Sequence, residues 1–348
     1  MLLVLSCILM VLFELIHLPA ALMFGPMIAG VLAGLRGASI RVSTRAFKMA
    51  QSIIGCMLAI SITPAVLSEF LNHWALLIGV ILSSIICSCV IGIVLTHLRV
   101  MPGSTAIWGS TPGAASAMIV IAQEYGADIR LVAFMQYYRV LLLAITASII
   151  AWTIQPVTTE NAVAATQVTE WFPAIDIVAF ASVIGIAIVG TLLGGFLHIP
   201  APALIGTLLL GGVLHGLGWA DMQLPPWLLT ISFVVLGWKV GLVFDREIVQ
   251  HVYKSLPVIT VSVIVLMLFC GFLSWILAVT LDLDPLTAYL ANTPGGLESV
   301  AAIAASRPET NISFIMTLQT TRLILLTTIC PPLTKWVAKR YSDFSDSP

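Results

Sequence analysis

The sequence predicts an all-α polytopic membrane protein with two inverted-topology repeats of about five transmembrane helices each, plus a paired re-entrant or broken segment in each repeat. Three observations support this fold class. The chain is strongly apolar, sequence blocks of its first half recur in its second half, and basic residues change sides between matched loops.

Composition places the chain in a membrane. Of the 348 residues, 59% are hydrophobic and only 9% are charged, whereas a soluble domain carries about 25% charged residues. The apolar runs have helical length and lack the weak alternation of an outer-membrane barrel, so α-helical spans are expected. The first run, residues 2–16, lacks a basic n-region and an A-x-A cleavage site. We therefore expect a retained first span rather than a signal peptide.

An internal repeat organises the chain. The segments "GSTPGAASAM" (109–118) and "ANTPGGLESV" (291–300) share a TPG triplet, which begins at 111 and again at 293. "HLPAALMFGPMIAG" (17–30) likewise matches "HIPAPALIGTLLLG" (198–211), and "MQYYRVLLL" (135–143) matches "LQTTRLILL" (318–326), at nearly the same offset. A tandem duplication explains these matches. The expected domains are membrane repeat 1 (1–153), an extracytoplasmic connector (154–175), an inverted membrane repeat 2 (176–334) and a cytoplasmic tail (335–348).

The loop charges predict that the repeats are inverted. The loop at 36–48 contains three arginines and a lysine, whereas its counterpart at 218–229 contains no basic residue. In two further pairs of matched loops, Lys and Arg are again present in one half and absent from the other, in the sense that an inverted topology requires. Arg307 is the one loop residue that does not follow this rule. Cytoplasmic loops retain Lys and Arg, so opposite charge bias implies opposite orientation. Both termini are therefore expected in the cytoplasm.

Counting spans constrains the two TPG segments. We expect ten spans, near 2–17, 19–35, 47–64, 74–97, 130–152, 177–197, 199–218, 227–244, 256–280 and 312–334. Five spans per half give antiparallel halves only if 101–126 and 285–308 do not add a full crossing. Backbone that is not helical at membrane depth is tolerated only inside protein or beside a water-filled cavity. The two segments should therefore line such a cavity.

The TPG residues suit a binding site for an anion. Thr111 and Thr293 can act as helix N-caps, with Pro112 and Pro294 at the first helical position. Free N–H groups at such a helix start attract anions, and glycine permits close approach; these glycines are Gly113, Gly295 and Gly296. Paired Gly/Pro-interrupted segments in inverted halves indicate the substrate site of a transporter. The alternative is two ordinary helix starts in surface loops.

Two arginines occupy matched positions inside the last apolar run of each half. Arg139 follows Gln136 by one helical turn, and Arg322 follows Gln319 in the same way, so each Gln and Arg share a helix face. An arginine within a span costs about 2.5–3.5 kcal/mol on insertion scales and normally faces a partner or a cavity. The pair either helps to hold an anionic group of the solute, or binds neighbouring helix carbonyls or snorkels to an interface. The sequence leaves both alternatives open.

Glu298 is the candidate for coupling to a proton or cation. It follows the second TPG triplet, and its counterpart in the first repeat is Ser116. The alternative is that its carboxylate only stabilises the start of a helix. The six histidines are scattered without metal-ligand spacing, so neither a metal nor another cofactor is expected.

The chain resembles a known bacterial family over nearly its whole length. The blocks "LPAALMFGPMIAG", "WGSTPGAASAMIVIAQEYGADIRLVAFMQYYRVL", "LGWKVGLVFD" and "YLANTPGGLESVAAIAA" resemble the AbrB-type inner-membrane proteins, which contain an "AbrB duplication". The resemblance implies a multi-pass protein of the bacterial inner (plasma) membrane. Family members are labelled regulators of gene expression or, formerly, ammonia monooxygenases. The absence of clustered ligand residues argues against the monooxygenase label and predicts that the chain is not an enzyme.

Two functions remain for comparison. The leading hypothesis is a secondary transporter of a small solute with an anionic group, whose effect on gene expression would be indirect. The alternative is a membrane regulator or sensor that binds a ligand or partner without transporting it. The expected partners are the lipid bilayer and the solute. Direct nucleic-acid binding is not expected, because the tail has no base-reading motif. The sequence does not decide whether the chain forms a homo-oligomer.

Overall fold

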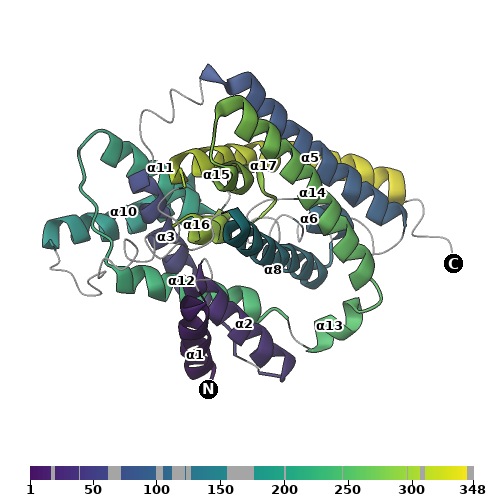
Figure 1. Ribbon diagram of the computed structural model, residues 1–348, viewed down its shortest axis with the longest axis horizontal. Coiled ribbons are helices and arrows are strands. Elements are labelled where there is room, and N and C mark those ends of the chain that lie inside the picture. The colour runs from purple at the N-terminus through teal and green to yellow at the C-terminus, as the bar shows by residue number, and fades with distance from the viewer. Residues whose placement is uncertain are drawn as a thin grey trace.

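The structure is helical throughout its described part (Figure 1). It is a computed structural model that describes residues 1–16, 20–38, 40–61, 72–98, 105–111, 122, 127–154, 176–199, 201–244, 246–295, 297–305 and 310–342. These residues contain helices joined by turns and irregular segments, with no β-strand among them. The all-α prediction is therefore confirmed for this part of the chain.

The helices of the first half recur in order in the second half. The first half contains α1 (Leu2–Leu15), α2 (Ala21–Leu35), α3 (Thr44–Ser61), α5 (Trp74–His97), α6 (Thr105–Ser110) and α8 (Ile129–Ile154). The second half contains α10 (Ile177–Phe196), α11 (Pro202–Gly216), α12 (Pro226–Gly241), α13 (Arg246–Val252), α14 (Leu256–Leu281), α15 (Pro285–Asn292), α16 (Leu297–Ala305) and α17 (Ile312–Ser342). Each of the ten expected spans coincides with one of the longer helices. The predicted connector lies almost wholly outside the described residues.

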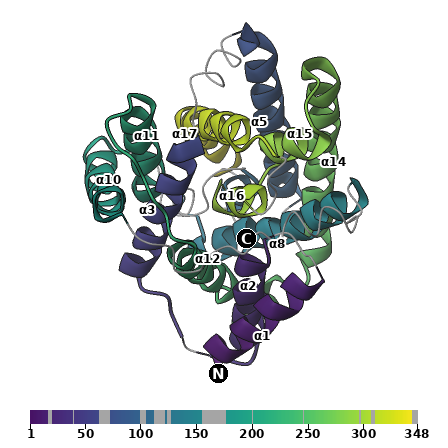
Figure 2. The same ribbon diagram turned by 60° about the vertical axis from the view of Figure 1, so that its left-hand side comes forward.

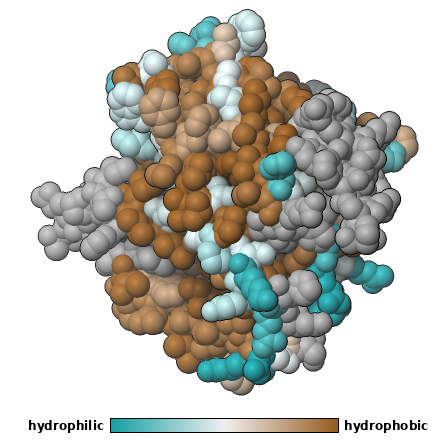
Figure 3. Space-filling view, turned by 90° about the vertical axis from the view of Figure 1, so that its right-hand side faces the viewer, coloured by the Kyte–Doolittle hydropathy of each residue, from teal (hydrophilic) through white to brown (hydrophobic). Residues whose placement is uncertain are grey.

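Four stretches of helix are long and apolar enough to cross a membrane: Trp74–His97, Ile129–Ala147, Ile177–Phe196 and Leu256–Leu281. Five further apolar stretches are shorter, at 10–17 residues. Apolar side chains also dominate the coloured surface of the face shown in Figure 3. On α14 the exposed side chains include Leu268, Phe272 and Trp275. The chain thus has the composition and the exposed apolar helices of a membrane protein.

Matched capping contacts begin the last helix of each half. The Asp128 carboxylate accepts from the backbone N–H groups at the start of α8, and the Asn311 amide oxygen accepts from Phe314 N–H at the start of α17. Such side chains satisfy the unpaired donors of a first helical turn. Asp128 N–H donates to Thr105 Oγ1 over 3.1 Å, and Asn311 N–H donates to Thr287 Oγ1 over 3.1 Å. The start of α8 is thereby tied to α6, and the start of α17 to α15.

The helices pack as two bundles, each built from both halves of the chain. We call α1, α2, α3, α10, α11 and α12 the glycine bundle, and α5, α6, α8, α14, α15, α16 and α17 the TPG bundle. Within the glycine bundle α3 packs on α11 as α2 packs on α12, so that the halves interlock. Between the bundles the main contacts run from α3 to α16 and α17. Figure 2 shows α16 near the centre, with α3 on one side and α8, α14 and α15 on the other.

Glycines allow the glycine bundle to pack closely. A Cβ atom on Gly30 of α2 would lie only 3.1 Å from the Cα atom of Gly241 in α12. A Cβ on Gly194 of α10 would lie 2.8 Å from the carbonyl oxygen of Pro202 and 3.2 Å from the Cα of Gly206 in α11. Small residues at such crossings let membrane helices approach and gain dispersion energy. These glycines therefore serve close helix packing.

Alanine substitutions at Gly194 and at its neighbour Gly195 distinguish the effect of close packing on stability from the effect of helix propensity. We expect Gly194→Ala to lower the free energy of unfolding by about 1–3 kcal/mol, because the new methyl group overpacks a tight contact. Gly195 has no atom within 4 Å of an added Cβ. Gly195→Ala should therefore leave stability unchanged or raise it by about 0.5–1 kcal/mol. Thermal unfolding of the two purified variants in one detergent measures the difference, and equal melting temperatures would contradict close packing at Gly194.

Candidate functional site

The second TPG segment interrupts a helix inside the TPG bundle. Helix α15 ends at Asn292, α16 begins at Leu297, and the described residues 293–295 between them are not helical. Every residue from Leu286 to Gly295 is buried, as is every residue of α6 and Thr111 after it. Buried non-helical backbone needs hydrogen-bond partners from elsewhere in the fold. The described residues of both segments are thus buried inside the protein, and the expectation that the segments line a water-filled cavity stays a prediction.

A glutamine replaces the N–H group that each proline lacks. In an α-helix the carbonyl of residue i accepts from the N–H of residue i+4. For Leu290 that residue is Pro294, and for Trp108 it is Pro112, neither of which has an N–H. Gln319 Nε2 donates to Leu290 O over 2.8 Å, and Gln136 Nε2 donates to Trp108 O over 2.8 Å. Each glutamine thus satisfies the carbonyl that the proline leaves unpaired.

Each arginine binds the next carbonyls of the same helix end. Arg322 Nη1 donates to Asn292 O over 3.2 Å and to Thr293 O over 2.7 Å, while Nη2 donates to the Oε1 atom of Gln319 over 2.5 Å. Arg139 Nη1 donates to Ser110 O over 2.9 Å, and its Nη2 donates to Gln136 Oε1 over 2.6 Å. The two guanidinium groups therefore lie at the negative carboxyl ends of α15 and α6. We call each Gln and Arg pair with its carbonyls a carbonyl clamp.

A further pair of matched contacts ties each clamp to the preceding long helix. Ser110 Oγ lies close to Ser88 O on α5, and Ser88 Oγ donates to Ser110 O over 3.0 Å. In the second repeat Asn292 Nδ2 donates to Cys270 O on α14 over 2.9 Å. The short helices α6 and α15 are thus each held by two long neighbours. Protein groups therefore fix the carboxyl ends of both α6 and α15.

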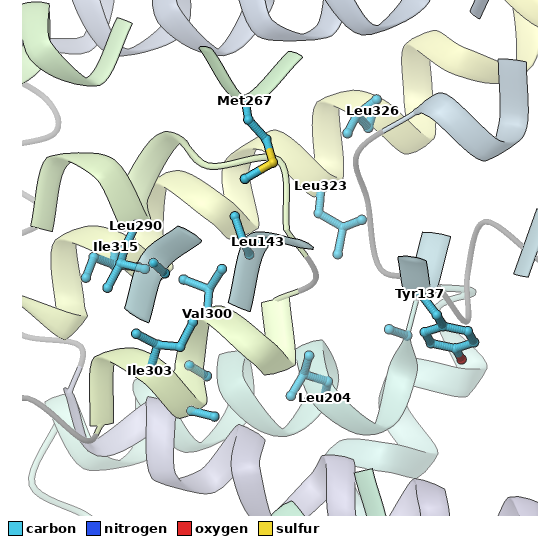
Figure 4. Packing of buried hydrophobic residues seen from close by; sticks show 14 of the residues in the cluster. Tyr137, Leu143, Leu204, Met267, Leu290, Val300, Ile303, Ile315, Leu323 and Leu326 are labelled. Atoms are coloured by element: carbon cyan, nitrogen blue, oxygen red, sulfur yellow. The ribbon is translucent and has the colours of Figure 1, made fainter. Parts of the chain in front are cut away.

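One face of α8 meets the second TPG segment. A Cβ atom at Gly295 would collide with the Cδ2 atom of Leu143, and Thr146 Oγ1 lies 3.1 Å from the Tyr289 hydroxyl of α15. Arg139, Leu143 and Thr146 share this face because residues spaced by three and four align along a helix. Figure 4 shows Leu143 in the same apolar cluster as Val300 of α16. Helix α8 thus holds the first TPG segment through Arg139 and contacts the second through Leu143 and Thr146.

The predicted arginine and glutamine positions come together, and their contacts favour one of the two alternatives. Arg139 is 1% exposed and Arg322 is 3% exposed, so neither side chain snorkels to an interface. Both guanidinium groups bind helix carbonyls, as the structural alternative expected. Direct contact of Arg139 or Arg322 with a solute stays a prediction.

Thr293 differs from the expected N-cap. Thr111 Oγ1 donates backward to Ile107 O over 2.7 Å, but the residues that follow Thr111 lie outside the described part, so its role as an N-cap stays a prediction. Thr293 Oγ1 has no hydrogen-bond partner within 3.5 Å. Thr293 instead has an extended conformation (ψ 141°) after the end of α15, and α16 begins only at Leu297. Pro294 therefore lies in the interruption rather than in the first turn of a helix. The reason is tertiary, because the clamp holds the Thr293 carbonyl and keeps the chain extended there.

Several of the predicted positions lie outside the described residues, namely Pro112, Gly113 and Gly296. Glu298 belongs to the first turn of α16, and its side chain is also outside the described part. Within the described part, no group of three or more His, Cys, Asp or Glu side chains could hold a metal ion. The assignment of the chain as a non-enzyme stays a prediction.

Ser110, Asn292 and the Thr146–Tyr289 contact were not predicted from the sequence. Ser110 and Asn292 directly precede the two TPG triplets, so the repeat alignment could have indicated their matched roles. No sequence pattern connects Thr146 with Tyr289, which are 143 residues apart. That contact follows only from how the two halves pack.

Comparison with known proteins gives one consistent result. Residues 22–338 match a family model described as "Transition state regulatory protein AbrB". The chain belongs to the AbrB family. It is 38% identical over 338 residues to the Escherichia coli (strain K12) protein "Putative regulator AbrB", with 97% of this chain and 96% of that protein covered. It is 26% identical over 312 residues to the Bacillus subtilis (strain 168) "Uncharacterized protein YhjN", with 84% and 78% covered. No solved structure matches it.

Loss of one clamp arginine should destabilise this AbrB-family chain strongly. Arg322→Met leaves buried carbonyl groups without donors, and each unsatisfied group costs about 1–3 kcal/mol. Arg322→Lys keeps the charge but not the planar set of donors, so an intermediate loss is expected. Thermal unfolding in detergent measures both, with Arg41→Met at an exposed position as the control. An Arg322→Met variant as stable as the control would rule out a structural clamp.

Proposed function

We propose that this AbrB-family protein is a secondary transporter of a small anionic solute, and that the solute binds where the two interrupted helices meet the carbonyl clamps. The observation that supports this most strongly is the pair of buried arginines held on matched broken-helix ends. Interrupted helices at membrane depth form the substrate sites of many transporters. The proposal includes inverted repeats, an inner-membrane location and cytoplasmic termini, which the loop charges favour.

The charge balance at the clamps favours an anion. Among the described residues, the two guanidinium groups meet carbonyl and amide oxygens and no carboxylate. Each helix carboxyl end supplies roughly half a negative charge. Two buried arginines therefore leave a net charge of roughly +1 in a region shielded from water, where electrostatic interactions are strong. A single anionic group from the solute would neutralise it.

The two-bundle architecture supports alternating access. The glycine bundle is closely packed and interlocked, whereas its contacts with the TPG bundle are concentrated on α3. Movement of one bundle against the other, with rearrangement of the apolar contacts that they share, would expose the TPG segments first to one side and then to the other. Glu298, at the start of α16, remains our candidate for coupling this movement to a proton or cation gradient.

A regulatory role without transport is the second candidate, favoured by the printed name of the Escherichia coli relative, "Putative regulator AbrB". Such a protein would bind its ligand and signal through a partner. The two candidates differ in one measurable property, which is whether bound ligand crosses the membrane.

Flux measurements on reconstituted protein distinguish the two candidates. We expect proteoliposomes to take up radiolabelled small carboxylates faster than empty liposomes, with uptake driven by an imposed proton or sodium gradient. Glu298→Gln should abolish gradient-driven accumulation while leaving exchange of labelled for unlabelled solute, because exchange needs no net ion movement. Arg41→Met serves as the control. Saturable binding of carboxylates without any flux would refute transport and support the regulator.

A further inference from the structure

The two repeats differ in how their polar side chains are satisfied at the TPG interruptions. In the first repeat the hydroxyl groups of Ser110 and Thr111 both form hydrogen bonds within α6. In the second repeat the Oδ1 atom of Asn292 and the Oγ1 atom of Thr293 are buried without a hydrogen-bond partner within 3.5 Å, and the Thr293 hydroxyl has the Tyr289 hydroxyl as its polar neighbour. Such groups are rare, because leaving one unpaired costs about 1–3 kcal/mol. The second interruption therefore carries hydrogen-bonding capacity that the fold itself does not use.

A third unpaired atom lies on the helix that faces this interruption. Arg139 Nε is buried without a partner, although the other two nitrogens of the guanidinium are bonded. Arg139 shares its face of α8 with Leu143, which touches Gly295, and with Thr146, which contacts Tyr289. The Arg139 guanidinium is also close enough to that of Arg322, which holds the Asn292 and Thr293 carbonyls, for the two charges to interact.

The three unpaired atoms differ in whether they can donate or accept a hydrogen bond. Arg139 Nε–H can only donate, and Thr293 Oγ1 can donate as well as accept. Asn292 Nδ2 already donates to Cys270 O, so that Oδ1 is the carbonyl side of the amide and can only accept. A ligand that satisfies all three offers anionic oxygens to Arg139 and Thr293 and one donor to Asn292.

We propose that Arg139, Thr293 and Asn292 form a binding site for a small hydroxycarboxylate, a proposal that rests on the proposed function and names its substrate class. The carboxylate accepts from Arg139 Nε–H and the Thr293 hydroxyl, and the hydroxyl group of the ligand donates to Asn292 Oδ1. An ammonium group could also donate to Asn292, but the nearby arginine charges disfavour a second cation. Arg322 has a positioning role, since its clamp holds the carbonyls of Asn292 and Thr293.

The test compares ligands that differ by one hydroxyl group. Full-length protein in detergent is titrated calorimetrically with the pairs glycolate and acetate, lactate and propionate, and 3-hydroxybutyrate and butyrate. We expect at least one hydroxy acid to bind tenfold or more tightly than its partner, because a buried acceptor rejects a ligand that leaves it unpaired. No preference in any pair would overturn the proposal.

Substitutions assign the preference to individual atoms. Asn292→Ser introduces the residue found at the matched position 110, whose hydroxyl bonds within its own helix and contacts the neighbouring one. This variant should keep the affinity for the plain acid and lose the preference for the hydroxy acid. Thr293→Val should weaken both ligands at least tenfold while leaving the melting temperature of free protein unchanged or higher, because the lost hydroxyl has no partner. A lower melting temperature with unchanged affinity would assign Thr293 a structural role and overturn the site.

Thr320 provides a matched control. Its Oγ1 atom is also buried without a partner, but it follows Gln319 by one residue and so points about 100° away around α17. Thr320→Val should leave every affinity unchanged, and an effect equal to that of Thr293→Val would overturn the assignment.

Binding and transport can fail separately. If the three atoms show the expected pattern in detergent but proteoliposomes do not take up the preferred hydroxy acid, the site stands and transport is refuted. If proteoliposomes transport plain carboxylates independently of Asn292 and Thr293, transport stands and the assignment of this site is wrong.

Discussion

The need to satisfy backbone carbonyls inside an apolar protein governs the centre of this structure. A proline in each TPG triplet removes the N–H group that would complete the preceding helix, and no water is expected at that depth to replace it. Gln136 and Gln319 supply an amide donor in its place, and Arg139 and Arg322 bind the carbonyls that follow. The interrupted helices, the buried charges and the position of α8 and α17 against α6 and α15 all depend on these contacts.

The same contacts explain why each half contains a buried arginine, although an arginine is costly to place within a membrane span. A guanidinium group offers several donors in a fixed plane, so one side chain can bind two carbonyl groups and a glutamine together. The helix ends partly compensate its charge and leave the remainder available to a ligand. Structural and functional interpretations of the arginines are therefore compatible, since a positively charged clamp shapes the backbone and also determines the sign of what can bind beside it.

Matched contacts in the two halves form a common frame, and the two halves differ in the polar side chains that this frame holds. Both repeats keep the clamp, the contact to the preceding long helix and the tie to the start of the last helix. Around this common frame Ser110 and Asn292 differ in size and in hydrogen-bonding capacity, and only the second leaves an acceptor unpaired. A symmetric scaffold can thus carry a site with one chemically active side.

The sequence by itself determined the all-α class, the positions of the longer helices, the interruption at residues 293–295 and the pairing of Gln136 with Arg139 and of Gln319 with Arg322. These follow from hydropathy, proline chemistry and helical spacing, which are local properties of the chain. Only the tertiary structure decided which groups the arginines bind, that Thr293 lies in extended chain rather than capping a helix, and that Leu143 and Thr146 meet the second repeat. Those features depend on contacts between residues far apart in the chain, because packing selects among partners that local sequence leaves equivalent.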